Sequence, residues 1–390
     1  MSMQLRERGL AVKLAERIRE ESKRVLSEHG GDEIRIMNFC GTHEWTITHY
    51  GLRSLMPPWI NLIAGPGCPV CITPGYYIDV LVDVSFEKDT VVLTYGDAFK
   101  LPGSRGKQPR SLFHAKAMGG NVKVVYSFRD AITEAAREPG RRHVFLAVGF
   151  ETTMPSTAIP LAAGEVPGNL YVLSAYRLTP PIMRFLAEAH PEVRLDGVIA
   201  PGHVSTVIGA EAWRFIADEY GIPVVVSGFE PLDVLLSIYM IIRNLAEGKP
   251  RLMNEYSRVV APEGNKYALN AMWEVYEARD SYWRGIGVVP LSGAVHRPRY
   301  SGHDFFESTG LRETVTDDKH PGCICDKVVL GLAKPTQCPL FMKACTPGNP
   351  YGPCMVSSEG TCRIWAENTP LLHGAVAWNA GENSDPRRVH

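Results

Sequence analysis

The sequence lacks the features that mark several specialised classes of protein. Its 41 basic and 42 acidic residues leave a formal net charge of −1, so no excess of either sign points to a nucleic acid or a membrane surface as partner. The most apolar helical stretch, at 234–242, is too short to span a bilayer. The charged N-terminal stretch has no apolar core of the kind found in signal peptides. We therefore expect a cytoplasmic protein with no nucleic-acid or membrane partner.

The middle of the chain lacks cysteine altogether. Cys40, Cys68 and Cys71 lie before this gap, and the remaining six of the nine cysteines lie between Cys323 and Cys362. In a reducing compartment cysteines are more often ligands, nucleophiles or redox groups than structural disulfides. The distribution predicts two separate thiol sites.

The part of the chain between these sites has the pattern of an α/β protein. Nearly continuous apolar runs rich in β-branched residues predict strands at 34–39, 60–65, 90–96, 122–128, 143–150, 170–176, 197–202 and 223–229. Helical patterns follow several of these runs, which favours parallel sheets buried on both faces. A Gly-Phe-Glu sequence occurs at 149–151 and again at 228–230, and this weak echo favours two similar sheets over one.

The length of 390 residues predicts two or three domains, and the sequence pattern changes near residue 250. We expect similar parallel-sheet α/β domains at 1–140 and 141–250, with the helix at 230–250 as an optional completion of the first. The third, 251–390, is expected to be helical or irregular, with a helical stretch at 254–280 broken near Pro262 and Gly264. Residues 320–362, rich in Cys, Pro and Gly, would need a metal or disulfides to become ordered, and a polar tail follows.

The segment at 40–44 places chemically active groups between the end of a predicted strand and the start of a predicted helix. A thiol at a helix N-terminus has a lowered pKa, which predicts a reactive Cys40. His43 is three residues further and would project to the same side of the first helical turn. Glu44 could act as an acid or base, or cap the helix. The alternative is a buried cysteine followed by a helix-capping segment.

Other strand ends carry further candidates. Cys68 and Cys71 form a Cys-x-x-Cys pair, typical of a redox pair or half of a metal site, or else two packing cysteines in a turn. Glu151 and His203 follow later strands, and ligands of open α/β sheets bind at this edge. If the two sheets face each other, these groups line one cleft with the early thiols, although His203 could equally be a capping or core histidine.

The late cysteines outnumber the ligands of a single metal centre. Four thiolates can hold a zinc ion or an iron–sulfur cluster, and the two that remain could form a dithiol pair beside it. Zinc ribbons favour tight Cys-x-x-Cys pairs, which this region does not contain. The alternative is a zinc-stabilised subdomain with two bystander thiols. The six are Cys323, Cys325, Cys338, Cys345, Cys354 and Cys362.

Taken together, these motifs resemble those of the HypD family of hydrogenase maturation factors. The resemblance is carried by CGTHE at 40–44, GPGCPVC at 65–71, GFETT at 149–153, PGHVS at 201–205, GFEP at 228–231 and the late cysteine spacing x14, x6, x16. It implies two similar α/β domains facing each other across a cleft and a third domain that carries a [4Fe-4S] cluster. It also implies a scaffold, monomeric when alone, on which the Fe(CN)2CO unit of [NiFe]-hydrogenase is assembled with HypC and HypE, the cyanide donor.

The resemblance also assigns roles to residues. The cluster ligands would be Cys323, Cys338, Cys345 and Cys362, and the redox dithiol pair would be Cys325 and Cys354. The nascent iron, with its cyanide and CO ligands, would be held by Cys40, Cys68 and Cys71, with His43 in the same motif. No free-standing turnover of a small substrate is expected.

Two other functions stay open on the sequence alone. One is a free-standing thiol–disulfide oxidoreductase resembling ferredoxin:thioredoxin reductase. The other is a zinc-stabilised binding module without redox chemistry.

Overall fold

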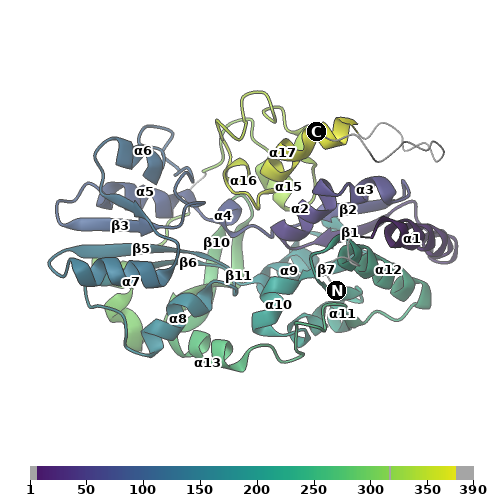
Figure 1. Ribbon diagram of the computed structural model, residues 1–390, viewed down its shortest axis with the longest axis horizontal. Coiled ribbons are helices and arrows are strands. Elements are labelled where there is room, and N and C mark those ends of the chain that lie inside the picture. Colours follow the sequence, from purple (N-terminus) through teal and green to yellow (C-terminus); the bar gives the residue numbers. More distant parts are fainter. Residues whose placement is uncertain (1–6, 316–317, 375–390) are drawn as a thin grey trace, which may run out of the picture.

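A computed structural model describes residues 7–315 and 318–374 of the chain, and it contains all eight predicted strands. They form two parallel sheets, which lie on the two sides of the molecule in Figure 1. Sheet A has the order β2-β1-β7-β8-β9 and sheet B the order β4-β3-β5-β6. The strands of sheet A are β1 (Ile34–Asn38), β2 (Ile60–Ala64), β7 (Gly197–Pro201), β8 (Val224–Ser227) and β9 (Leu252–Asn254). Those of sheet B are β3 (Thr90–Thr94), β4 (Val122–Val124), β5 (Arg142–Gly149) and β6 (Leu170–Tyr176).

The chain visits sheet A, then sheet B, and then returns to sheet A. The predicted boundary at residue 140 falls between β4 and β5, which belong to the same sheet. The sheets therefore divide the chain differently from the ranges 1–140 and 141–250, because β1 pairs with the distant strand β7. Parallel strands need a crossover connection, and here that connection contains the whole of sheet B.

Helices cover the sheets with their apolar faces. On sheet A, α1 (Arg8–His29) packs against α12 (Pro231–Glu247), so the helix at 230–250 does join the N-terminal elements, over a core that includes Ile18, Ile36 and Ile238. The other helices of the α/β part are α2 (Gly41–His49), α3 (Leu52–Leu55), α4 (Pro69–Ile72), α5 (Gly75–Val84), α6 (Leu112–Ala117), α7 (Phe128–Arg137), α8 (Met154–Ala162), α9 (Thr179–Ala189), α10 (Gly202–Ile208) and α11 (Arg214–Tyr220).

The prediction of a helical stretch at 254–280 is only partly correct. Helix α13 (Lys266–Val275) is followed at once by a hairpin of β10 (Tyr276–Trp283) and β11 (Gly287–His296). Tyr276 and Trp283 have a spacing that fits a helix. Both instead lie on β10, and their rings are fully buried. The hairpin lies beside β6, and just after that strand the Leu178 amide donates to the Ser292 carbonyl at 2.7 Å. Tertiary packing thus overrides the local helical pattern.

The cysteine-rich region consists of short helices and loops, as its composition predicts, and lies above the sheets in Figure 1. Its helices are α15 (Cys325–Val329), α16 (Pro353–Val356) and the start of α17 (Thr361–Gly374), whereas α14 (Phe305–Thr309) precedes the region and packs against β6. The predicted polar tail beyond residue 374 lies outside the described residues. Within the described part of the chain, no helix is both long and apolar enough to cross a bilayer.

Candidate functional site

The carboxyl edge of sheet A brings four of the sequence motifs together. Asn38 at the end of β1 is in register with Ala64 of β2, and Pro201 of β7 is in register with Ser227 of β8. Since β7 also pairs with β1, the loops that follow these four strands lie side by side. They carry the segments at 40–44, 65–71, 201–205 and 228–231, whereas the segment at 149–153 follows β5 of sheet B.

Close backbone packing holds the first two loops against the cysteine-rich region. A Cβ on Gly67 would lie 2.5 Å from the Cys40 nitrogen, and a Cβ on Gly41 would lie 2.5 Å from the Glu359 carbonyl oxygen. Any larger residue at either position would have to displace backbone atoms. The two glycines therefore fix Cys40 between the Cys68 loop and the segment that leads into α17.

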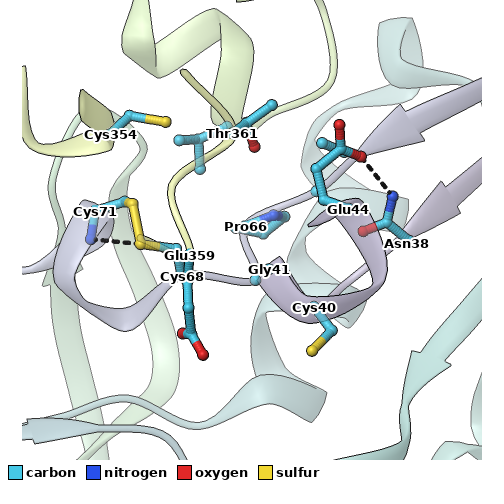
Figure 2. A pocket seen from close by; sticks show the side chains of 14 residues that line it. Asn38, Cys40, Gly41, Glu44, Pro66, Cys68, Cys71, Cys354, Glu359 and Thr361 are labelled. Carbon is cyan, nitrogen blue, oxygen red and sulfur yellow. Dashed lines mark hydrogen bonds between the residues drawn. A yellow bond between two sulfur atoms is a disulfide. The ribbon is translucent and has the colours of Figure 1, made fainter. Parts of the chain in front are cut away.

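A small cavity, with ≈ 10 Å³ of free space, lies where these segments meet. Cysteines from both ends of the sequence line it: Cys40, Cys68, Cys71 and Cys354. Figure 2 shows them together with two carboxylates, Glu44 and Glu359. We call this cavity the thiol pocket. The free space suffices for about one water-sized group.

Cys354 reaches the thiol pocket because α16 packs against α4, the short helix that carries Cys71. Cys68, Cys71, Cys345, Cys354 and Cys362 all belong to one buried apolar cluster. The two groups of cysteines are therefore in contact, through Cys354 at the thiol pocket. The sequence gap between the two groups of cysteines is bridged by the fold, which places the late segment on top of the early strand ends.

Cys68 and Cys71 form a disulfide. The Cys71 amide also donates to the Cys68 sulfur at 3.2 Å, which closes the first turn of α4. In this state Cys40 is the one member of the early trio with a free thiol. Cys68 and Cys71 would have to be reduced before either could hold iron.

Cys40 is the N-cap of α2, as predicted, but its thiol is not activated by that position. Burial, followed by the nearby Glu359 carboxylate, raises the pKa of Cys40 to about 11. The expectation of a lowered pKa is therefore wrong, because desolvation and a negative neighbour outweigh the helix terminus. In Figure 2 the Glu359 side chain lies between Cys40 and the disulfide in this view. Glu359 lies three residues before Cys362 and belongs to none of the sequence motifs, so the sequence did not identify it.

His43 is turned away from the thiol pocket. Its Nε2 lies 2.9 Å from the Gly228 carbonyl and 3.2 Å from that of Ser227, and its ring stacks on Phe229. Burial lowers the pKa of His43 to about 4, so the ring is neutral at pH 7 and donates from Nε2. His43 therefore ties α2 to the loop after β8, and it is not brought to the same site as Cys40.

Glu44 lines the thiol pocket, yet its carboxylate is fully engaged. It is 1% exposed and accepts hydrogen bonds from Asn38 (3.0 Å) and the Trp365 indole (2.7 Å), as well as from the side chain of Thr48. Arg53 reaches both carboxylate oxygens at 2.8 Å. The residue connects β1, α2 and α3 to α17, which indicates a structural anchor.

Glu151 and His203 lie outside the thiol pocket. The Glu151 carboxylate accepts from the Thr179 amide at 2.7 Å and from its hydroxyl at 3.0 Å, at the start of α9. Burial raises the pKa of Glu151 to about 7. His203 is exposed and stacks on Phe229 at 3.8 Å between ring centroids.

The late cysteines form two contacts that the spacing did not predict. The thiol of Cys323 lies next to that of Cys325, and this neighbour lowers the pKa of Cys323 to about 7. The thiol of Cys362 lies next to that of Cys354, whose sulfur accepts a hydrogen bond from the Cys362 amide at 3.2 Å. Each contact joins one predicted cluster ligand to one predicted redox thiol, so the two sets interleave.

The donors in this region suit an iron–sulfur cluster in kind. Cys323, Cys345 and Cys362 are buried and Cys338 is half-buried, and soft thiolates are the usual ligands of such clusters. A Cβ on Gly352 would lie 3.0 Å from the Cys323 sulfur, so a larger residue there would crowd the thiols. In the described residues, however, no three or more His, Cys, Asp or Glu side chains are arranged to hold a metal ion.

Comparison with known proteins gives a consistent family. Residues 10–369 match the family model for HypD, described as "Hydrogenase formation hypA family". The chain is 43% identical to the hydrogenase maturation factor HypD of Rhodobacter capsulatus, over 85% of this chain and 88% of that protein. It is 41% identical to the Cupriavidus necator factor of the same name, over 92% and 94%. It is 40% identical to that of Escherichia coli, over 91% and 94%.

Proposed function

The chain belongs to the HypD family of hydrogenase maturation factors, and on this premise we propose that it is the scaffold on which the Fe(CN)2CO unit of [NiFe]-hydrogenase is assembled with HypC and HypE. Family membership supports a role in hydrogenase maturation. The observation that carries the finer proposal is the thiol pocket, where Cys40, the Cys68–Cys71 disulfide and Cys354 meet. One free thiol for iron and a redox-active pair beside it are what such an assembly needs.

In this proposal Cys40 holds the iron, which is the cargo of the reaction. Iron that carries cyanide and CO needs soft, electron-rich ligands, and a thiolate is one. The raised pKa of Cys40 means that the free thiol keeps its proton until a cation replaces it. The Glu359 carboxylate, which disfavours a free thiolate, favours a bound cation at the same place.

The late cysteines would supply the electrons. Cyanide that arrives as a thiocyanate on HypE is released by a two-electron reduction, RSCN + 2e⁻ + H⁺ → RSH + CN⁻. Oxidation of the Cys325–Cys354 dithiol to a disulfide releases two electrons and two protons, so the two half-reactions balance with one proton left over. A [4Fe-4S] cluster, held by Cys323, Cys338, Cys345 and Cys362, supplies single electrons when it is bound.

The position of Cys354 supports this assignment. It lies at the thiol pocket beside the Cys68–Cys71 disulfide, while its thiol also contacts Cys362. Thiol–disulfide exchange between Cys354 and the disulfide would therefore connect the late cysteines to the iron-binding thiol.

A second candidate is a free-standing thiol–disulfide oxidoreductase, which the Cys68–Cys71 disulfide itself favours. Such an enzyme would turn over a generic protein disulfide without HypC or HypE. The scaffold would not, so a disulfide-reduction assay on the isolated chain separates the two functions.

Anaerobic purification followed by metal analysis tests the proposal. We expect a brown protein with about four irons per chain in the cluster. Stoichiometric zinc and no visible absorption would contradict the proposal and support a zinc-stabilised binding module.

A further inference from the structure

A second cavity lies on the other flank of the cysteine-rich region, away from the thiol pocket. It has a volume of ≈ 490 Å³ and is lined by residues of three segments, 100–114, 318–321 and 348–351, together with Arg284. We call it the basic pocket. Its size is that of a typical ligand site, and the sequence of the first segment is rich in Gly, Ser, Lys and Arg.

The charges of the basic pocket do not cancel. Arg284, which is buried, pairs with Asp318, and Arg105 pairs with Asp83 at 2.6 Å. Among the described residues no carboxylate pairs with Lys100 or Arg110. Both are exposed, so the unpaired positive charge stands at the rim, while the deep arginine is already satisfied. The rim is therefore complementary to an anionic partner.

An exposed aromatic ring lies beside Lys100, one of the two rim charges. Phe113 is 43% exposed, its ring packs edge-on against Phe99, and the Lys100 ammonium lies 5.5 Å from its centroid. Aromatic residues and arginine are enriched at protein–protein contact surfaces, and positive charge at the rim steers an acidic partner. A site for a small anion would need unpaired positive side chains at the bottom of the pocket. The deep arginine, Arg284, is instead paired with Asp318. These features favour an acidic protein over a small anion.

The inner wall of the basic pocket is joined directly to two of the late cysteines. The Tyr351 amide donates to the Cys345 sulfur at 3.4 Å, and the Cys323 amide donates to the His320 carbonyl at 2.9 Å. The His320 ring packs edge-on against Tyr351 at 4.5 Å between centroids. A protein seated at the rim would thus be separated from Cys323 and Cys345 by this single layer of residues.

We propose that the basic pocket is the docking site of an acidic one-electron carrier protein that reduces the cysteine-rich region. The inference rests on the proposed function, in which this region supplies electrons. At each encounter the carrier is oxidised by one electron and the region is reduced by one. Two encounters supply the two electrons that the release of one cyanide consumes.

The test measures how fast the anaerobic, iron-loaded protein is reduced, by stopped-flow bleaching of its visible absorption at low ionic strength. The probes are a reduced plant-type [2Fe-2S] ferredoxin, which is acidic, and reduced methyl viologen, a small cation that needs no docking. The variant is Lys100→Glu/Arg110→Glu, and the matched control is Lys13→Glu/Arg17→Glu on the exposed face of α1, on the far side of the molecule (Figure 1).

We expect the charge reversal at the rim to slow reduction by ferredoxin at least about tenfold and to abolish its salt dependence. Reduction by methyl viologen should not slow, and the α1 control should behave like the wild type with both probes. Unchanged reduction by ferredoxin in the rim variant would overturn the docking site, as would equal slowing with both probes. A colourless wild-type protein without iron would overturn the proposed function, and the docking site with it.

Discussion

Glu44 offers a sharp test of structure against sequence, because its motif suggested an acid or base and its contacts indicate an anchor. Its carboxylate is 1% exposed and accepts hydrogen bonds from four side chains. Glu44→Gln keeps the shape but leaves the Arg53 guanidinium, itself 21% exposed, without its charged partner. Breaking a buried ion pair costs about 3–5 kcal/mol. Since the glutamine oxygen can still accept from some donors, we expect the free energy of unfolding to fall by an amount near the lower limit, about 3 kcal/mol.

Urea unfolding followed by tryptophan fluorescence measures this loss. The matched control is Glu219→Gln, which removes an exposed pair with Arg184 and should change the free energy of unfolding by about 0.5 kcal/mol or less. Amide hydrogen exchange should also increase in α17, because the Trp365 indole loses a charged acceptor. If Glu44→Gln unfolded like the wild type while hydrogenase maturation was lost, the anchor would be refuted and a chemical role for Glu44 supported.

Three further predictions follow from the site. Substituting Cys338 or Cys345 by Ala should remove the visible absorption and increase hydrogen exchange in residues 320–362, because a metal centre contributes to the folding of its loops; retained colour would contradict the ligand set. Substituting Cys325 or Cys354 by Ala should keep the absorption but stop cyanide release, and bleaching of either variant would show that the assignment is wrong. Burial raises the pKa of Glu151 from 4.5 to about 7, so the folded state holds a proton that the unfolded state loses, and stability falls as pH rises from 4.5 to 7. In urea unfolding, the stability of the wild type relative to Glu151→Gln should therefore fall by up to about 3 kcal/mol across that window, and a difference independent of pH would contradict the raised pKa.

The strands could be predicted from the sequence, but their partners could not. Runs such as 90–94 and 143–149 are buried on both faces, so their apolar character is visible without any knowledge of the fold. The pairing of β1 with β7 joins residues far apart in the sequence, and no local pattern encodes it. The hairpin at 276–296 was missed for the opposite reason, since its first strand is half polar and follows a helix without a break.

The candidate site could be predicted as a set of residues but not as a geometry. Cys40 and Cys68 were found because each follows a buried strand, and the register of β1 with β2 does bring their loops together. His43 and Glu44 are neighbours in one motif, yet they point to partners on different elements, the Gly228 carbonyl and the Trp365 indole. The sequence also gave no sign that α16 would place Cys354 at the thiol pocket, because that contact depends on how the cysteine-rich region packs on α4.

The most direct test of the account is the infrared spectrum of the Cys40→Ala protein in its complex with HypC. The Cys40 side chain is small and half-buried, so its loss should lower the free energy of unfolding by at most roughly 1–2 kcal/mol. The variant should therefore fold and keep the visible absorption expected of the proposed cluster. If the proposed function is right, the wild-type complex should show the bands of iron-bound cyanide and CO, and we predict that the variant lacks them. Bands of normal intensity would contradict the account and show that the iron is held elsewhere, with Cys68 and Cys71 as the next candidates.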